Sequence, residues 1–127
     1  MSSITSPHLV VSDVTFRPEI EVSVETHLYR QLAANTACTW QALLKANFDR
    51  WFATFHPTSM LHDPLTVSAA LQLPYVDFSL ERVAVDADGR MRLTEEGRPV
   101  FVGRSADYDA FMKWVEAGLG AGRSTLR

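Results

Sequence analysis

The sequence lacks the features that mark several large classes of protein. Its one cysteine, Cys38, excludes an intrachain disulfide and a zinc site built from cysteines. Basic residues are fewer than acidic ones, 12 against 15, so the chain offers no basic footprint for nucleic acid or an anionic membrane. No apolar run approaches the roughly 20 residues that span a bilayer, and the polar start has no signal-peptide pattern. We therefore expect a soluble, cytoplasmic protein with no nucleic-acid or membrane partner.

Common catalytic and metal-binding motifs are also missing. The four histidines show no tight metal-ligand spacing, and the six glycines are too scattered to form a phosphate-binding loop. Residues 86–89 begin like a calcium loop, but Arg90 and Met91 stand where the EF-hand pattern requires an oxygen ligand and a glycine. Asp88-Gly89 is instead typical of a β-hairpin turn.

The apolar pattern predicts strands and helices in the order β-α-α-α-β-hairpin-β-α, which is an α/β domain over residues 8–119. We expect polar, flexible tails at 1–7 and 120–127. Asp63 and Ser105 are the expected N-caps of the third and last helices, and Ser23 that of the first. The predicted elements are a strand at 8–16, helices at 24–33, 36–54 and 64–71, a hairpin of 78–85 with 91–94, a strand at 99–103 and a helix to 119.

The first predicted strand contains a continuous apolar run, Leu9-Val10-Val11, where a half-buried strand would alternate. Such runs are typical of parallel strands that are covered on both faces. A strand of this kind needs neighbours on both sides, and the chain offers few. The pattern therefore suggests that the sheet belongs to a larger assembly.

The candidate site begins at His62 and Asp63. An Asp that precedes proline at the start of a helix is most often a cap, and a neighbouring histidine is most often an ordinary surface residue. The functional alternative is that Asp63 offers oxygens to a hard cation such as Ca²⁺, while His62 faces the same pocket as a proton donor. The residues alone leave both interpretations open.

The helix before this site carries more aromatic residues than one buried stripe requires. Phe48, Trp51, Phe52 and Phe55 exceed a single helical face, so one or two of them are free to line a pocket or a partner surface.

Residues 62–71, His-Asp-Pro-Leu-Thr-Val-Ser-Ala-Ala-Leu, resemble the His-Asp-Pro-Leu-Ala-Val-Ala-Ala-Ala-Leu segment of the inosine-uridine nucleoside hydrolases. These calcium-dependent enzymes cleave the N-glycosidic bond of nucleosides. Residues 11–15 resemble the family's Gly-Leu-Asp-Val-Thr strand, with Ser12 where leucine is usual. The order of the later elements also follows the C-terminal part of the family. The resemblance covers most of residues 8–119 and implies a partial nucleoside hydrolase-like (Rossmann-like) fold.

The resemblance also implies roles for individual residues. Asp63 would be a calcium ligand that helps to hold the ribose hydroxyls, and His62 would be the proton donor to the leaving base. In some members, aromatic residues before the motif close over the base. Trp51, Phe52 and Phe55 would be their loose equivalents here, although no tyrosine stands among them.

One large part of the family pattern is absent from this sequence. The N-terminal half of these enzymes carries an Asp-x-Asp-x-Gly-x-Asp-Asp loop, which supplies most calcium ligands and activates the water. Asp63 alone cannot supply the roughly six to eight oxygens that calcium takes. The resemblance therefore implies a C-terminal portion that contributes to Ca²⁺-dependent nucleoside hydrolysis once another chain supplies the missing part. Water would then attack C1′ while His62 assists departure of the base.

Two other hypotheses remain open. The first is that the chain is a non-catalytic dimerisation or protein-binding module derived from that fold, with an uncovered sheet edge and the aromatic helix face as contact surfaces. Alternatively, it is a piece of a longer protein. The expected partners are a nucleoside-like small molecule and either a second protein chain or further copies of this chain.

Overall fold

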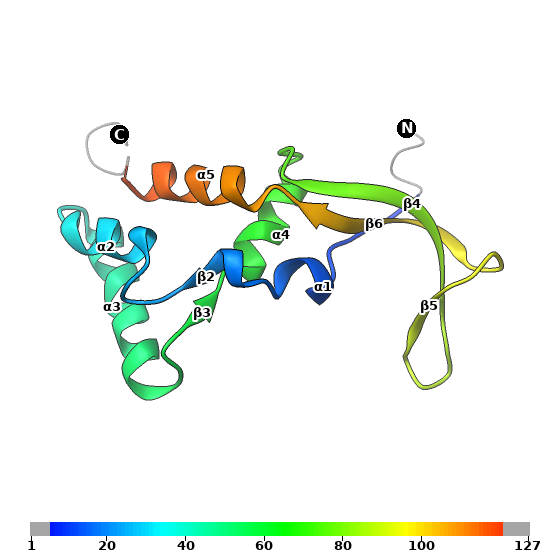
Figure 1. Ribbon diagram of the computed structural model, residues 1–127, viewed down its shortest axis with the longest axis horizontal. Helices are drawn as coiled ribbons and strands as arrows, with labels where there is room; N and C mark the ends of the chain where they lie inside the picture. Colours follow the sequence, from blue (N-terminus) through cyan, green and yellow to red (C-terminus); the bar gives the residue numbers. More distant parts are fainter. Residues whose placement is uncertain (1–5, 121–127) are drawn as a thin grey trace.

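The computed structural model describes residues 6–120 of the 127-residue chain. This part is a small mixed α/β domain with five α-helices, a four-stranded mixed sheet and a separate two-stranded ladder (Figure 1). The mixed α/β class predicted from the sequence is thereby confirmed. The flexible tails predicted at 1–7 and 120–127 fall almost entirely on residues 1–5 and 121–127, which lie outside the described residues.

The elements follow one another with short connections. They are β1 (His8–Leu9), α1 (Ser12–Thr15), the 3₁₀ turn η2 (Pro18–Ile20), β2 (Glu21–Val22), α2 (His27–Ala34), α3 (Thr39–Thr54), β3 (Ser59–Met60), α4 (His62–Ala70), β4 (Val76–Val85), β5 (Met91–Leu93), β6 (Arg98–Ala106) and α5 (Tyr108–Gly120).

The large sheet has the strand order β1-β6-β4-β5. The long strand β4 pairs antiparallel with both β5 and β6, while β1 runs parallel to β6 with Leu9 opposite Val102. β5 and the end of β4 beside it extend away from the helices: α2, α3 and α5 lie at the other end of the molecule, and α1 and α4 lie near its middle (Figure 1). The sheet thus has one half that helices cover and a projecting half, formed by β5 and the part of β4 paired with it.

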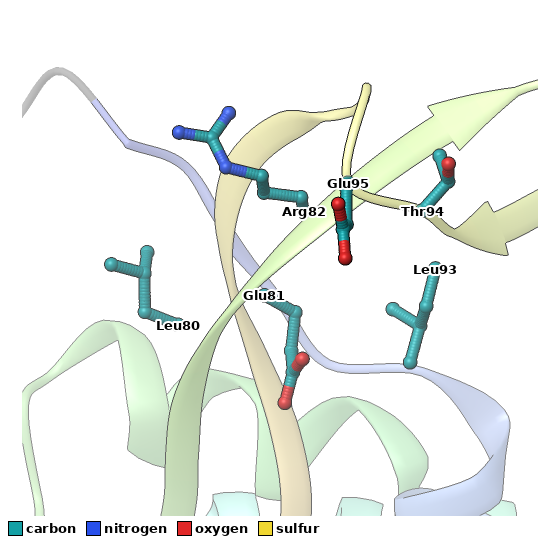
Figure 2. A pocket seen from close by; sticks show the side chains of 6 residues that line it. All are labelled: Leu80, Glu81, Arg82, Leu93, Thr94 and Glu95. Carbon is teal, nitrogen blue, oxygen red and sulfur yellow. The ribbon is translucent and has the colours of Figure 1, made fainter.

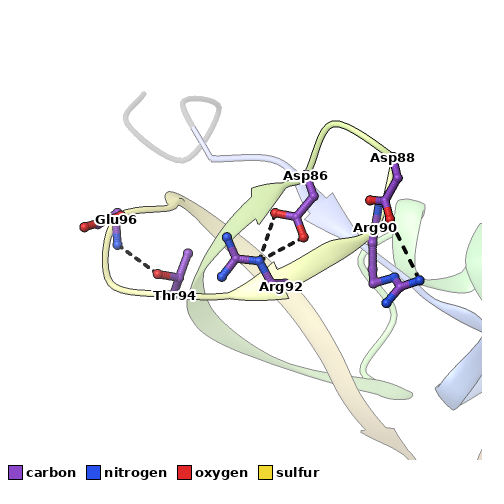
Figure 3. Close-up of polar contacts among 6 residues, drawn as sticks. All are labelled: Asp86, Asp88, Arg90, Arg92, Thr94 and Glu96. Atoms are coloured by element: carbon purple, nitrogen blue, oxygen red, sulfur yellow. Dashed lines mark hydrogen bonds and ion pairs between the residues drawn. The ribbon is translucent and has the colours of Figure 1, made fainter.

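The predicted hairpin turn is confirmed. Gly89 has a φ of +86°, and its N–H donates to the carbonyl of Asp86 at 2.9 Å. The Arg92 Nε donates to both carboxylate oxygens of Asp86, at 2.9 and 3.0 Å, and Arg90 lies beside Asp88 (Figure 3). These contacts close the tip of the projecting hairpin.

The prediction of a strand over residues 8–16 is wrong beyond Leu9. Residues 12–15 form the single helical turn α1, in which the Phe16 N–H donates to the carbonyl of Ser12 at 2.7 Å. The apolar residues are divided between an edge strand and this turn, which buries Val14. Because β1 lies at the edge of the sheet, Leu9 is only half-buried and does not need neighbours on both sides.

The predicted helix starts also need correction. The helix predicted from residue 24 begins at His27, because Ser23 takes part in a turn that precedes it. Asp63 is the second residue of α4, behind His62, and makes no capping bond. Ser105 lies in β6, and the Asp107 Oδ1 accepts the Ala110 N–H at 3.1 Å at the start of α5. Of these three helices, only α5 begins with a side-chain hydrogen bond, and the residues before α2 and α4, Thr26 and Leu61, make none.

The core lies where α4, α5 and the β2–β3 ladder meet. An apolar stripe of α5 faces it, with Phe111 fully buried at the centre. The buried members of this core are Val14, Ile20, Val22, Leu28, Leu61, Leu65, Val76 and Phe111.

Gly97, between β5 and β6, lies against the backbone of β4. A Cβ at this position would meet the backbone N and C of Val83 at 2.5 Å. We expect Gly97→Ala to lower the free energy of unfolding by about 2 kcal/mol, because a backbone cannot move aside as a side chain can. The measurement is urea unfolding, with Gly118→Ala as the control.

Gly118 lies in α5 with open space around its Cα, so the same substitution removes helix-destabilising glycine without a clash. Gly118→Ala should therefore raise the free energy of unfolding by up to about 1 kcal/mol. Equal unfolding midpoints for the two variants would contradict the close approach at Gly97.

Candidate functional site

A cavity of about 540 Å³ opens between the end of α3, the β2–β3 ladder and the start of α4. Two of the five predicted site residues, His62 and Trp51, line it. Its size falls in the range of small-molecule sites, and it combines aromatic walls with several polar groups. The lining residues are Phe16, Glu21, Trp51, His56, Thr58, Ser59, Met60 and His62.

The β2–β3 ladder determines which side chains face this cavity. Glu21 pairs with Met60, and the Leu61 N–H donates to the carbonyl of Ile20 at 3.1 Å. Successive side chains of an extended segment point to opposite sides. Ile20 and Val22 are fully buried in the core, and Glu21 between them lines the cavity.

His62, the first residue of α4, is held by a buried hydroxyl. Its Nδ1 lies 2.9 Å from the Oγ1 of Thr15, a side chain that is only 5% exposed. The ring of Phe16 lies close by, at a centroid distance of 6.0 Å. When Thr15 donates this hydrogen bond, the proton of a neutral imidazole sits on Nε2. That nitrogen is then the one available to donate to a bound molecule.

The position of Thr15 is itself fixed from α5. The Tyr108 hydroxyl donates to the carbonyl of Val14 at 2.6 Å, and Arg17 lies over the Tyr108 ring at 5.4 Å. Burial raises the pKa of Tyr108, so its hydroxyl remains a donor throughout the physiological pH range. The helix turn that carries Thr15 is thus tied to the last helix of the chain.

Trp51 forms a flat wall of the cavity near the end of α3. Its Nε1 donates to the carbonyl of Thr58 at 2.8 Å, and its ring stacks on Phe55 at 5.1 Å with an interplanar angle of 27°. The residue is 42% exposed. An indole fixed in this way offers a pre-positioned surface on which a planar ligand can stack.

Helix α3 is held in place by polar contacts on its other sides. Lys45 donates to Asp49 at 2.6 Å, and Tyr29 of α2 donates to the second carboxylate oxygen. These two hydrogen bonds lower the pKa of Asp49, while the carboxylate raises the pKa of Tyr29. The buried Gln41 donates to the carbonyl of Leu119 at 2.7 Å and so joins α3 to α5.

The other predicted site residues lie outside this cavity. Phe52 packs against the core, with its ring 5.8 Å from that of Tyr29. Phe55 is 70% exposed and supports Trp51 from the side. Asp63 is exposed and does not line the cavity, because consecutive helical residues point about 100° apart and His62 already faces it. The structure therefore brings His62 and Trp51 together and separates them from Phe52 and Asp63.

The donor groups that the structure describes do not fit a calcium ion by themselves. Residues 6–120 contain no group of three or more His, Cys, Asp or Glu side chains that could hold a metal ion. Asp63 offers one exposed carboxylate, whereas calcium takes roughly six to eight oxygens.

Glu21 and His56 are cavity residues that sequence reasoning missed. The apolar-polar-apolar pattern Ile20-Glu21-Val22 is a signal for an outward-facing Glu21, but a segment this short is easily passed over. His56 follows the end of α3, and its Nδ1 lies 3.1 Å from the Thr58 hydroxyl. No spacing rule connects it with His62.

A second hollow, of about 400 Å³, lies on the projecting half of the sheet. Its lining side chains come from both faces of β4, with Leu80 and Arg82 on one side and Glu81 and Leu93 on the other (Figure 2). They diverge and do not converge on a common point. This hollow is a poor candidate for a chemical site.

Three wider searches gave negative findings. No helix within residues 6–120 combines the length and the apolar character needed to cross a membrane. A scan against protein-family models found no matching family, and a search of curated proteins found no matching relative.

We expect Thr15→Val to release the His62 ring, because valine keeps the shape of threonine but removes the hydroxyl. The ring nitrogens of His62 should change their ¹⁵N shifts and their tautomer ratio, and the free energy of unfolding should fall by about 1 kcal/mol. The measurement is NMR of histidine-labelled protein. The exposed His27 serves as the internal control. Unchanged His62 shifts would contradict a role for Thr15 in holding the ring.

Proposed function

We propose that the chain binds a nucleoside, with the base in the cavity between Trp51 and His62, and contributes to hydrolysis of its N-glycosidic bond. One observation carries the proposal: a fixed aromatic wall and a fixed imidazole line the same cavity. The resemblance of residues 62–71 to the nucleoside hydrolases supports it independently, because His62 is the residue that the resemblance implies as proton donor.

The chemistry assigned to His62 is general acid catalysis. When the N-glycosidic bond breaks, the sugar becomes an oxocarbenium-like cation and the base departs with the bonding electrons. In its protonated form His62 would donate from Nδ1 to the Thr15 hydroxyl and deliver the Nε2 proton to the base, which neutralises that charge and leaves a neutral imidazole. Proton transfer of this kind contributes about 10²- to 10⁴-fold to a rate. Trp51 would hold the base by stacking, and the hydrogen bond to Thr15 would hold the imidazole in position.

The remaining chemistry requires residues from outside this chain. No group assigned above activates the attacking water, and the described residues do not form a calcium site. Asp63, exposed beside His62 on the first turn of α4, is available as one ligand of a site that a second protein chain completes. The chain alone should therefore bind nucleosides without hydrolysing them.

Calorimetric titration with inosine, with uridine and with ribose tests the proposal. The nucleosides should bind and ribose should not, because the cavity recognises the base. Trp51→Ala should weaken nucleoside binding about 10- to 100-fold, the range expected when a base loses its stacking partner.

The matched control is His27→Ala, at an exposed histidine of α2 that lies outside the cavity, which should leave the affinity unchanged. The proposal would be overturned by the absence of nucleoside binding, or by an affinity that Trp51→Ala does not alter. Hydrolysis is then assayed on the complex with the completing chain, where His62→Ala should lower the rate.

A second candidate function is dimerisation through the projecting half of the sheet. Val85 and Met91 face each other across β4 and β5, as do Val83 and Leu93, so these side chains share one face. Val85, Met91 and Leu93 are 64%, 48% and 56% exposed. Adjacent exposed apolar side chains of this kind often mark a protein contact surface.

Sedimentation velocity tests this candidate. If the face joins two copies, the protein should sediment as a dimer and Leu93→Asp should convert it to a monomer, because a carboxylate cannot be buried there without a partner. Leu43→Asp, on the exposed side of α3, is the matched control and should leave the dimer intact. A monomeric unsubstituted protein would rule out self-association through this face.

A further inference from the structure

Glu21 is the one acidic residue among those lining the cavity. Within residues 6–120, no hydrogen bond or ion pair engages its carboxylate, whereas the nearby Glu19 is paired with Arg17 at 2.9 Å. The side chain is half-buried and lies on the opposite side of β2 from the buried Val22. A carboxylate in this setting retains its full capacity to accept hydrogen bonds from a ligand.

The other polar groups of the cavity are of a different kind. His56 and His62 can each donate from a ring nitrogen, and Thr58 and Ser59 contribute a hydroxyl each. An ionised carboxylate only accepts, and it accepts best from two parallel N–H groups at once. The cavity thus combines one acceptor-only group with several groups able to donate.

Nucleic-acid bases differ in what they offer to such a carboxylate. Guanine presents N1–H and the 2-amino group side by side on one edge, which matches both carboxylate oxygens. Adenine presents the acceptor N1 on the same edge, and a carboxylate would repel it. Guanine also carries the acceptors O6 and N7 for groups that donate.

We infer that Glu21 recognises the edge of the bound base and makes the cavity selective for guanine. The inference rests on the proposed binding of a nucleoside in this cavity and specifies which nucleoside that is. Hydrogen bonds to a charged group are strong enough for about 10- to 100-fold discrimination. Guanosine should therefore bind at least tenfold more tightly than adenosine.

Calorimetric titration of the full chain with guanosine and with adenosine provides the test, together with Glu21→Gln. The glutamine amide accepts one hydrogen bond and donates another, so it suits the N1 and 6-amino groups of adenine and loses one bond to guanine. We expect Glu21→Gln to reduce the guanosine-to-adenosine preference at least tenfold. Glu25→Gln, at an exposed glutamate outside the cavity, should leave the preference unchanged.

The outcomes separate this inference from the proposed function. If nucleosides bind but the unsubstituted protein does not favour guanosine, or if Glu21→Gln keeps the full preference, the role of Glu21 is refuted while the binding cavity stands. If neither nucleoside binds the unsubstituted protein, both fail. Glu21→Asp keeps the charge but withdraws it from the ligand, and a guanosine preference retained in full by this variant would also count against the inference.

Discussion

The short β2–β3 ladder is the constraint on which the candidate site depends. It joins Glu21 to Met60 and Val22 to Ser59, two segments that are otherwise separated by α2 and α3. Because successive side chains of a strand point to opposite sides, burying Val22 of β2 in the core places Glu21 on the other side, where it lines the cavity. The core and the cavity thus lie on opposite sides of the β2–β3 ladder.

The ladder is held by the apolar core behind it. Leu61 follows β3 directly, and Leu65 lies one turn further along α4, where it is fully buried with Phe111 of α5. This packing fixes the first turn of α4, and with it the position of His62. The imidazole then needs only the Thr15 hydroxyl to set its rotation. Apolar packing supplies the position, and a single hydrogen bond supplies the orientation.

The parts of the fold predicted from sequence are those with enough residues to show a period. Helix α3 and the apolar stripe of α5 repeat over several turns, and Asp88-Gly89 demands a tight turn. The strands β2 and β3 are two residues long, so no period could identify them. They form because the core brings them together, and local propensity does not encode that. The strand prediction over residues 8–16 is wrong for the same reason, since the packing partners of the apolar run at Leu9 are distant in sequence.

The candidate site, like the fold, has residues that the sequence predicts and residues that it does not. His62 is predictable as a site residue because its neighbours in sequence make a recognisable motif, and Trp51 because it stands on a long aromatic helix. Sequence adjacency groups Asp63 with His62, yet helical geometry turns adjacent side chains about 100° apart and leaves Asp63 outside the cavity. Under the proposed function, the same geometry would give the two residues separate uses. His62 can act on a ligand within this chain, while Asp63 is exposed on a surface where a second chain could reach it. A motif of two adjacent residues on one helix is therefore suited to a site shared between two chains.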